Sequence, residues 1–297
     1  MFDVLLNVVA PVAICIAIGY WWGKSATAYA TEFVTRLVIT IGAPCLIVST
    51  IDGGDMATED FLLMAGHTLL ILAGTLVLAL VVLTLMRKSL ALALPMVLPN
   101  VGNMGLSLSF FAFGEAGLAL TLVIFVMTSL IQFTSSDLVL GREGNLARRL
   151  GMLGRQPLIY GTLVAVLLII TGWKLPPAIA NATQLLAGIT IPLMLITLGV
   201  SLANLAAGNW RTGLLISAVR IPGGVAVSLA AVTLLGIEGL AAKILILQFA
   251  MPSAVFNYLF ALKHNRDPGA VASGVVISTM SSALVIPVVL WWLLERF

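Results

Sequence analysis

The residues able to do chemistry are few, and most of them fall in two otherwise apolar segments. One segment reads LPNVGNMGLSLSFF from Leu98, and the other reads QFAMPSAVFNYLF from Gln248. Both combine a proline with amide or hydroxyl side chains, which bind small ligands through hydrogen bonds. The candidate residues in these segments are Pro99, Asn100, Asn103, Gln248, Pro252, Ser253 and Asn257.

The proline in each segment predicts a broken helix, because proline lacks a backbone N–H and clashes with the preceding turn. The second half of each helix would begin after Asn100 or Ser253. A helix N-terminus has unpaired N–H groups and about half a positive charge, and Asn and Ser are good N-cap residues. Two such ends facing one another favour an anion site. The alternative is a pair of simple kinks whose backbone groups are satisfied by neighbouring helices.

The other polar residues within apolar stretches have open roles. Arg220 is the deepest charge, and it could attract an anionic substrate, extend toward the cytoplasm or pair with Asp137. Gln248 is a candidate for ion coupling, and His67 could sense protons because histidine titrates near neutral pH, although an interfacial or packing role is its default. Further oxygen donors could hold a cation or simply join helices by hydrogen bonds. They are Thr128, Ser129, Gln132, Ser278 and Thr279.

Composition requires a membrane around these residues. Of 297 residues, 61% are hydrophobic and 9% charged, and the mean hydropathy is +1.14. Soluble domains average roughly 45–50% apolar and about 25% charged residues. These values exclude a soluble domain, a disulfide scaffold, a disordered tail and a nucleic-acid module. The net charge of +3 is then explained by basic residues held on the cytoplasmic side.

Charged residues, Gly and Pro divide the chain into ten expected membrane spans, the first an uncleaved helix. They are 4–22, 33–51, 61–86, 90–113, 116–139, 158–173, 178–202, 211–235, 240–262 and 270–294. Basic residues gather in the loops after odd-numbered spans, so both termini are expected on the extracytoplasmic side of the cell (inner) membrane. These residues are Lys24, Arg87, Lys88, Arg142, Arg148, Arg149, Arg155, Arg211, Lys263 and Arg266.

The ten spans form two sets of five, which predicts an inverted repeat. The first repeat would be 1–140, the basic cytoplasmic linker 141–157 and the second repeat 158–297. An odd number of spans in each half places the halves in opposite orientations. Residues 35–44, TRLVITIGAP, resemble residues 183–192, TQLLAGITIP, at equivalent positions. Paired breaks in corresponding spans of such a repeat indicate a transport site.

At these motifs the chain resembles the auxin efflux carrier family, which includes bacterial permeases and plant PIN-formed carriers and is related in fold to bile-acid/sodium symporters. The resemblance lies in LPNVGNMGLSL followed by FGEAG, in APVAICIAIGYWWGK and in the last hundred residues, and it covers essentially the whole chain. It implies an all-α integral membrane protein with ten helices, of which the fourth and ninth are broken and cross.

The resemblance also implies a division of labour. Spans one, two, six and seven would form a scaffold, and spans 3–5 and 8–10 a moving transport domain, usually within a homodimer. The crossing would bind a carboxylate-bearing substrate, which maps onto Pro99, Asn100, Pro252 and Ser253. The second segment lacks the second Pro-Asn pair of the plant pattern, so the plant substrate does not carry over. Bacterial relatives are more often associated with small organic acids such as malate or malonate.

The expected function is therefore secondary transport of a small organic anion, a carboxylate or dicarboxylate, by an elevator-type alternating-access mechanism. No cofactor is expected, and coupling to H⁺ or Na⁺ stays open. The alternative is a cation/proton antiporter or a sodium-coupled symporter of the bile-acid transporter type, although no Asp or Glu lies deep in any span. Enzyme motifs such as HExxH and GxSxG are absent from the sequence, and so is a repeated filter motif of a channel.

Overall fold

The computed structural model describes residues 2–54, 56–139 and 156–296, and these residues are helical apart from their connections and one isolated bridge. The expected linker 141–157 lies outside the described residues except at its last two positions. The α-helices are α1 (Phe2–Lys24), α2 (Thr31–Leu37), α3 (Ala43–Gly53), α4 (Thr58–Leu85), α5 (Ala93–Val97), α6 (Leu106–Val139), α8 (Pro157–Thr171), α9 (Pro177–Ala187), α10 (Thr190–Asn204), α11 (Trp210–Ala218), α12 (Gly224–Leu235), α13 (Gly239–Phe249), α14 (Val255–Lys263) and α15 (Pro268–Arg296). Four short turns complete them: η1 (Val38–Gly42), η3 (Val101–Gly105) and η4 (Val219–Gly223), which are π-helical, and η2 (Leu90–Leu92), which is a 3₁₀ turn.

Large apolar side chains cover the outside of the bundle. Leu85 is 78% exposed, Leu234 84% and Leu284 77%. A surface of this kind is stable in lipid, where only helices satisfy their own backbone groups. Seven helices of the described chain are long and apolar enough to cross a membrane. The chain is therefore a multi-pass helical membrane protein.

The seven long helices account for most of the ten expected spans. One of them, Val101–Ser135, runs through two expected spans because helix continues on both sides of Gly114, whose φ of 64° turns the chain there. The expected span 158–173 appears as α8, which is shorter, and 240–262 appears as α13 and α14 with a gap between them. The described residues thus contain fewer long continuous helices than the ten expected spans.

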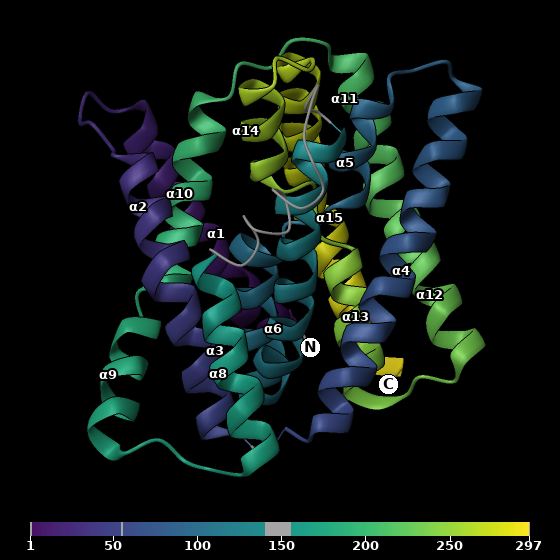
Figure 1. Cartoon of the computed structure of the whole chain (residues 1–297). Coiled ribbons are helices and arrows are strands. Elements are labelled where there is room, and N and C mark those ends of the chain that lie inside the picture. The colour runs from purple at the N-terminus through teal and green to yellow at the C-terminus, as the bar shows by residue number, and fades with distance from the viewer. Residues whose placement is uncertain (1, 55, 140–155, 297) are drawn as a thin grey trace.

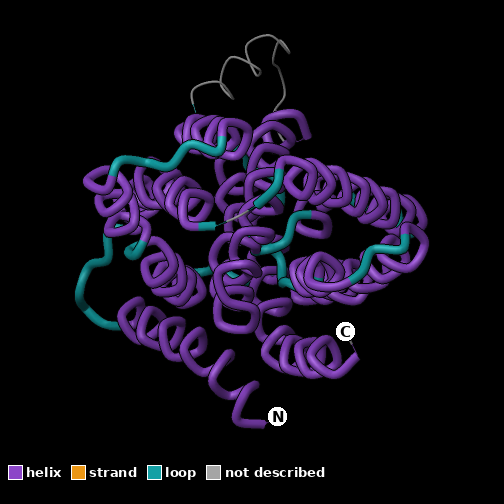
Figure 2. Tube along the Cα trace, turned by 90° about the horizontal axis from the view of Figure 1, so that it is seen from below, coloured by secondary structure: helices purple, strands orange, loops and turns teal. Residues whose placement is uncertain are grey.

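The helices run up and down through the molecule. Both termini lie in the lower half of Figure 1, the end that also holds the α3–α4, α8–α9 and α12–α13 connections. The α1–α2, α4–α5, α10–α11 and α14–α15 connections lie at the opposite end. Figure 2, which looks along the bundle from below, shows many of the helices nearly end-on. All basic residues of the α4–α5 and α14–α15 connections therefore share one end of the bundle.

Helices far apart in sequence meet through small residues. A Cβ on Gly19 of α1 would lie 2.0 Å from the carbonyl O of Ile196, and one on Gly199 of α10 would lie 2.1 Å from that of Ile16. A Cβ on Gly161 of α8 would lie 2.7 Å from Cα of Pro44 in α3. Small residues let membrane helices approach this closely, and dispersion contacts then hold them together. The α1–α10 and α3–α8 pairs are therefore joined backbone to backbone.

A second set of helices packs around α15 and α4. Helix α11 lies along α15, where Gly213 meets Ser273 and Gly274 meets Ile216, and α12 lies beside both α4 and α13. The two broken segments, α5–η3–α6 and α13–α14, run through this set. Its members carry most of the polar residues singled out above.

Candidate functional site

The two broken segments cross and pair with each other. Pro99 and Ser253 form an isolated antiparallel bridge. The backbone N–H of Asn100 donates to the carbonyl O of Pro252 at 2.8 Å, and that of Ala254 donates to the carbonyl O of Leu98 at 3.2 Å. Both helices are therefore interrupted by extended residues rather than kinked. The backbone groups freed by each break are satisfied by the other break, as buried amides require.

Asn100 begins the second half of the first broken segment. It is the N-cap of η3, and its Oδ1 accepts from the backbone N–H of Asn103 at 3.4 Å. Its own carbonyl O accepts from the N–H groups of Met104 and Gly105 at 3.3 and 3.2 Å. The side-chain Nδ2 is buried without a hydrogen-bond partner among the described residues. An unpaired buried donor costs about 1–3 kcal/mol, so Asn100 is arranged to receive an acceptor.

The second half-helix begins after Ser253, as expected, but Ser253 is not its N-cap. Helix α14 begins at Val255, and its N-cap Ala254 has no side-chain cap. The Ser253 hydroxyl instead accepts from Nδ2 of Asn257 at 3.1 Å, and its backbone N–H donates to Oγ of Ser278 at 3.1 Å. The bridge to Pro99 keeps Ser253 extended, so Ala254 takes the N-cap position that the residue type of Ser253 predicted for it.

Amide side chains join the two breaks to neighbouring helices. Asn257 donates from Nδ2 to the carbonyl O of Leu98 at 3.3 Å and accepts on Oδ1 from Nε2 of Gln132 at 3.0 Å. Gln248 donates from Nε2 to the carbonyl O of Gly105 at 3.1 Å and to Oγ of Ser109 at 2.7 Å. Buried hydrogen bonds of this kind fix a unique packing of the elements that they join. The structure thus brings Gln132, Gln248 and Asn257 together with both breaks.

Arg220 is fully buried in η4. Its Nη1 donates to the carbonyl O of Met96 at 3.2 Å and to that of Val97, and its Nη2 donates to the carbonyl O of Phe249 at 2.8 Å. The side chain therefore extends neither to the cytoplasm nor into a cavity described below. The side chain of Asp137, the partner considered from sequence, lies outside what the structure describes, although its backbone belongs to α6.

Two small cavities of about 30 Å³ each lie beside the crossing. The first is lined by Asn100 and Asn103, by Thr128, Ser129 and Gln132 of α6, and by Pro99 and several apolar residues. The second adjoins Asn103, Thr197 and Ser201. Ile39, Asn103, Met194 and Phe256 border both cavities. Each space equals about one water molecule's share of liquid volume.

The cavities separate the crossing from helices that the sequence did not connect with it. Ile39 lies in η1 and Met194 in α10, and both line the two cavities together with Asn103 and Phe256. Neither residue stands out in the sequence, because each is an ordinary apolar side chain in an apolar span. The one available signal was the similarity of windows 35–44 and 183–192, which contain or adjoin them.

The remaining candidates have hydrogen bonds within their own helices or lie away from the small cavities. The hydroxyls of Thr128 and Thr279 donate to carbonyls of their own helices, at 2.8 Å to Ile124 and 2.7 Å to Val275. His67 is half-buried in α4 and borders none of these cavities. No group of three or more His, Cys, Asp or Glu residues that could hold a metal ion occurs in the described part of the chain.

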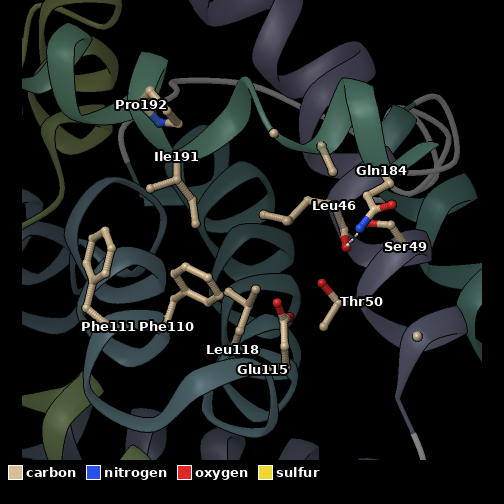
Figure 3. A pocket seen from close by; sticks show the side chains of 13 residues that line it. Leu46, Ser49, Thr50, Phe110, Phe111, Glu115, Leu118, Gln184, Ile191 and Pro192 are labelled. Atoms are coloured by element: carbon tan, nitrogen blue, oxygen red, sulfur yellow. Dashed lines mark hydrogen bonds between the residues drawn. The ribbon is translucent and has the colours of Figure 1, made fainter. Parts of the chain in front are cut away.

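A much larger cavity of about 520 Å³ lies between α3, α6 and the α9–α10 junction. It was not predicted from the sequence. In Figure 3 the Phe110 and Phe111 rings stand opposite Ser49 and Thr50, and Glu115 lies between them. The cavity follows the same boundary as the smaller ones, toward the end of the bundle that holds the α3–α4 connection. Its volume is many times that of the cavity beside Asn100.

Comparison with known proteins gives a consistent assignment. Residues 150–290 match a family model described as membrane transport protein. An uncharacterized transporter of Methanocaldococcus jannaschii is 29% identical over 215 residues, which cover 69% of this chain and 68% of the relative. An uncharacterized transporter of Methanothermobacter thermautotrophicus is 26% identical over 271 residues, 87% of each chain. The resemblance drawn from the sequence is thereby confirmed: the second half of the chain is similar to the membrane transport protein family, and both relatives are named as transporters.

Proposed function

We propose that the protein is a secondary transporter of a small organic anion, a carboxylate or dicarboxylate, and that the crossing is its binding site. The observation that carries the proposal is the buried Nδ2 of Asn100, which has no partner among the residues that the structure describes, at the N-terminus of η3 and beside a cavity. A helix N-terminus and an amide donor together suit a carboxylate oxygen. Asn103 and Gln132 border the same cavity and add amide groups.

The proposed transport step is a movement of the crossing along its boundary with α2–α3 and α10. A cavity of about 30 Å³ holds one water molecule, so the anion enters only when this boundary opens. The α1–α10 and α3–α8 pairs, joined through Gly19, Gly199 and Gly161, supply the rigid side of the boundary. The set around α4 and α15 supplies the moving side of an elevator-type mechanism.

An inverted repeat is part of the proposal, and two irregularities support it. The π-helical turn η1 falls inside window 35–44, and the interruption between α9 and α10 at Gly188 and Ile189 falls inside window 183–192. Each is followed by a proline, Pro44 or Pro192. Homodimer formation, an inner-membrane location and extracytoplasmic termini belong to the same proposal and rest on the family resemblance and the loop charges.

Uptake by proteoliposomes tests the proposal. Purified protein is reconstituted and given labelled malonate, malate, succinate and acetate, each with no gradient, a proton gradient or a sodium gradient. Saturable uptake of at least one carboxylate, lost in liposomes without protein, is expected. Carboxylate-independent movement of protons or sodium with no carboxylate uptake would overturn the proposal and favour the antiporter alternative.

A further inference from the structure

Arg220 contacts both broken segments, in each case at the C-terminal end of the first half-helix. Val97 is the last residue of α5, and Phe249 is the last residue of α13. The guanidinium donates to the carbonyls of Met96 and Val97 with one nitrogen and to that of Phe249 with the other. One cation thus contacts the C-terminal ends of the two first half-helices, which approach from different parts of the chain.

Those two ends carry negative partial charge. The last carbonyls of a helix have no intrahelical partner, and the aligned peptide dipoles place about half a negative charge there. Without a cation, this charge would lie beside the N-terminal ends of η3 and α14 and oppose their positive potential. A planar guanidinium satisfies carbonyls on two sides at once, which an ammonium does less well.

The local structure around Arg220 is shaped to allow this contact. Pro222 lies in the π-helical turn η4, where the regular hydrogen-bond ladder is interrupted. A Cβ on Gly224 would lie 2.1 Å from the carbonyl O of Phe249 and 2.3 Å from Nη2 of Arg220. The guanidinium carbon also lies 5.9 Å from the centre of the Phe249 ring, within the range of a cation–π interaction. Only glycine at position 224 leaves this space.

We propose that Arg220 is a positioning residue that clamps α5 to α13 and neutralises their C-terminal ends, so that only the positive N-terminal ends remain uncompensated at the crossing. Arg220 gives the site its preference for anions without touching the substrate. The effect on anion preference rests on the proposed function. The clamp itself is inferred from the hydrogen bonds alone.

Hydrogen–deuterium exchange of the detergent-solubilised protein tests the clamp. Arg220→Gln is expected to raise exchange at least tenfold in the peptides that contain Asn100 and Ala254, whose N–H groups hold the crossing together. Arg220→Lys is expected to keep wild-type exchange in at most one of these two peptides. Peptides from α1 and α10 serve as the internal reference and should keep wild-type exchange. Unchanged exchange at both crossing peptides in Arg220→Gln would overturn the clamp.

A matched glycine pair covers the case in which Arg220 variants do not fold. Gly224→Ala places a methyl group 2.1 Å from the carbonyl O of Phe249 and 2.3 Å from Nη2 of Arg220. Because the carbonyl belongs to the backbone and cannot turn aside, the guanidinium must move away from it. Gly223→Ala meets only the flexible end of Leu78, 2.7 Å from the added Cβ. Faster exchange at the Ala254 peptide is expected in Gly224→Ala and not in Gly223→Ala. Equal exchange in the two variants would contradict the proposed role of Arg220.

Uptake kinetics separate the clamp from general support of the fold. In proteoliposomes with labelled malonate, Gly224→Ala should raise KM about tenfold and change the maximal rate less than threefold, whereas loss of folded protein alone lowers the maximal rate. An unchanged KM would overturn the electrostatic part of the proposal. A wild-type protein that takes up no carboxylate would count against the proposed function instead, and the exchange experiment would still decide the clamp.

Discussion

The two breaks at the crossing are built from similar residues but are used differently. The first ends in a capping asparagine whose Nδ2 is buried next to a cavity and has no partner within the described part of the chain. The second has a serine whose hydroxyl and backbone N–H are both engaged, by Asn257 and Ser278. One break presents a free donor, and the other is braced on two sides. The difference teaches that two breaks of similar residue composition need not present equivalent hydrogen-bonding groups.

The bracing of the second break also supports the first break. A site that must hold an anion at a defined place needs rigid support around a small number of free donors. Asn257 supplies support by reaching Leu98 in the first break and Gln132 in α6. The free donor of Asn100 can then remain unpaired because the backbone around it is held by the Pro252 and Leu98 carbonyls.

The largest expected difference between the breaks is one of sidedness. Helices α5 and α13 should enter the membrane from opposite faces. A reagent that cannot cross the membrane should therefore label the start of only one of them from the outside. The two cysteines of the chain, Cys15 and Cys45, are first replaced so that they do not react. In this background Glu238→Cys should react with an impermeant thiol reagent added to whole cells, and Lys88→Cys should react only after lysis. Both positions are exposed, so accessibility within the protein is matched. Labelling of both from outside would refute the opposed arrangement.

The next largest effect is expected at Asn100. Asn100→Ala removes the unpaired donor and the N-cap of η3, and a hydrogen bond to a charged group contributes about 1.5–3 kcal/mol. Affinity for the transported carboxylate should fall roughly ten- to hundredfold by calorimetry, with residual binding by backbone N–H groups. Asn7→Ala, at an exposed position of α1, is the control and should bind as wild type. Wild-type affinity in a folded Asn100→Ala protein would place the site elsewhere.

Asn257→Ala should act mainly on stability. It removes the contacts to Leu98, Ser253 and Gln132, and unmade buried hydrogen bonds cost about 1–3 kcal/mol. A lower melting temperature is expected in a detergent thermal-shift assay, together with a smaller loss of affinity than in Asn100→Ala. If Asn257→Ala weakened binding more than Asn100→Ala at equal stability, the roles assigned to the two breaks would be reversed.

Ser253→Ala should give the smallest effect of the series. Its backbone contacts to Pro99 and Ser278 are kept, and only the acceptor for Asn257 is lost. A severalfold loss of affinity, within about 1 kcal/mol, is expected from the same calorimetric titration. A loss as large as that of Asn100→Ala would show that the second break contacts the anion directly.

The sequence predicted both breaks because the effect of proline on a helix is local. It did not predict that Ser253 leaves the N-cap position to Ala254, because the contacts of Ser253 are with Ser278 and Pro99, which are distant in the chain. Arg220 could be recognised as a buried charge, but its partners are backbone carbonyls of apolar residues, which no side-chain pattern marks. The binding roles of Pro99, Asn100, Asn103, Pro252, Ser253 and Asn257 stay predictions, as do ion-coupling roles for Thr128, Gln132, Gln248, His67 and Asp137.

The contact between α1 and α10 also limits how this chain can change over generations. A methyl group at Gly19 or Gly199 would overlap a main-chain carbonyl of the other helix, at 2.0 and 2.1 Å. A main-chain atom cannot be exchanged for a smaller one, so no second substitution in the partner helix restores the space. At Gly66, where nothing lies within 4 Å of an added Cβ, alanine costs nothing in packing. In a saturation library, substitutions at Gly19 and Gly199 are therefore expected to be absent from the functional variants, whereas substitutions at Gly66 are expected to be retained.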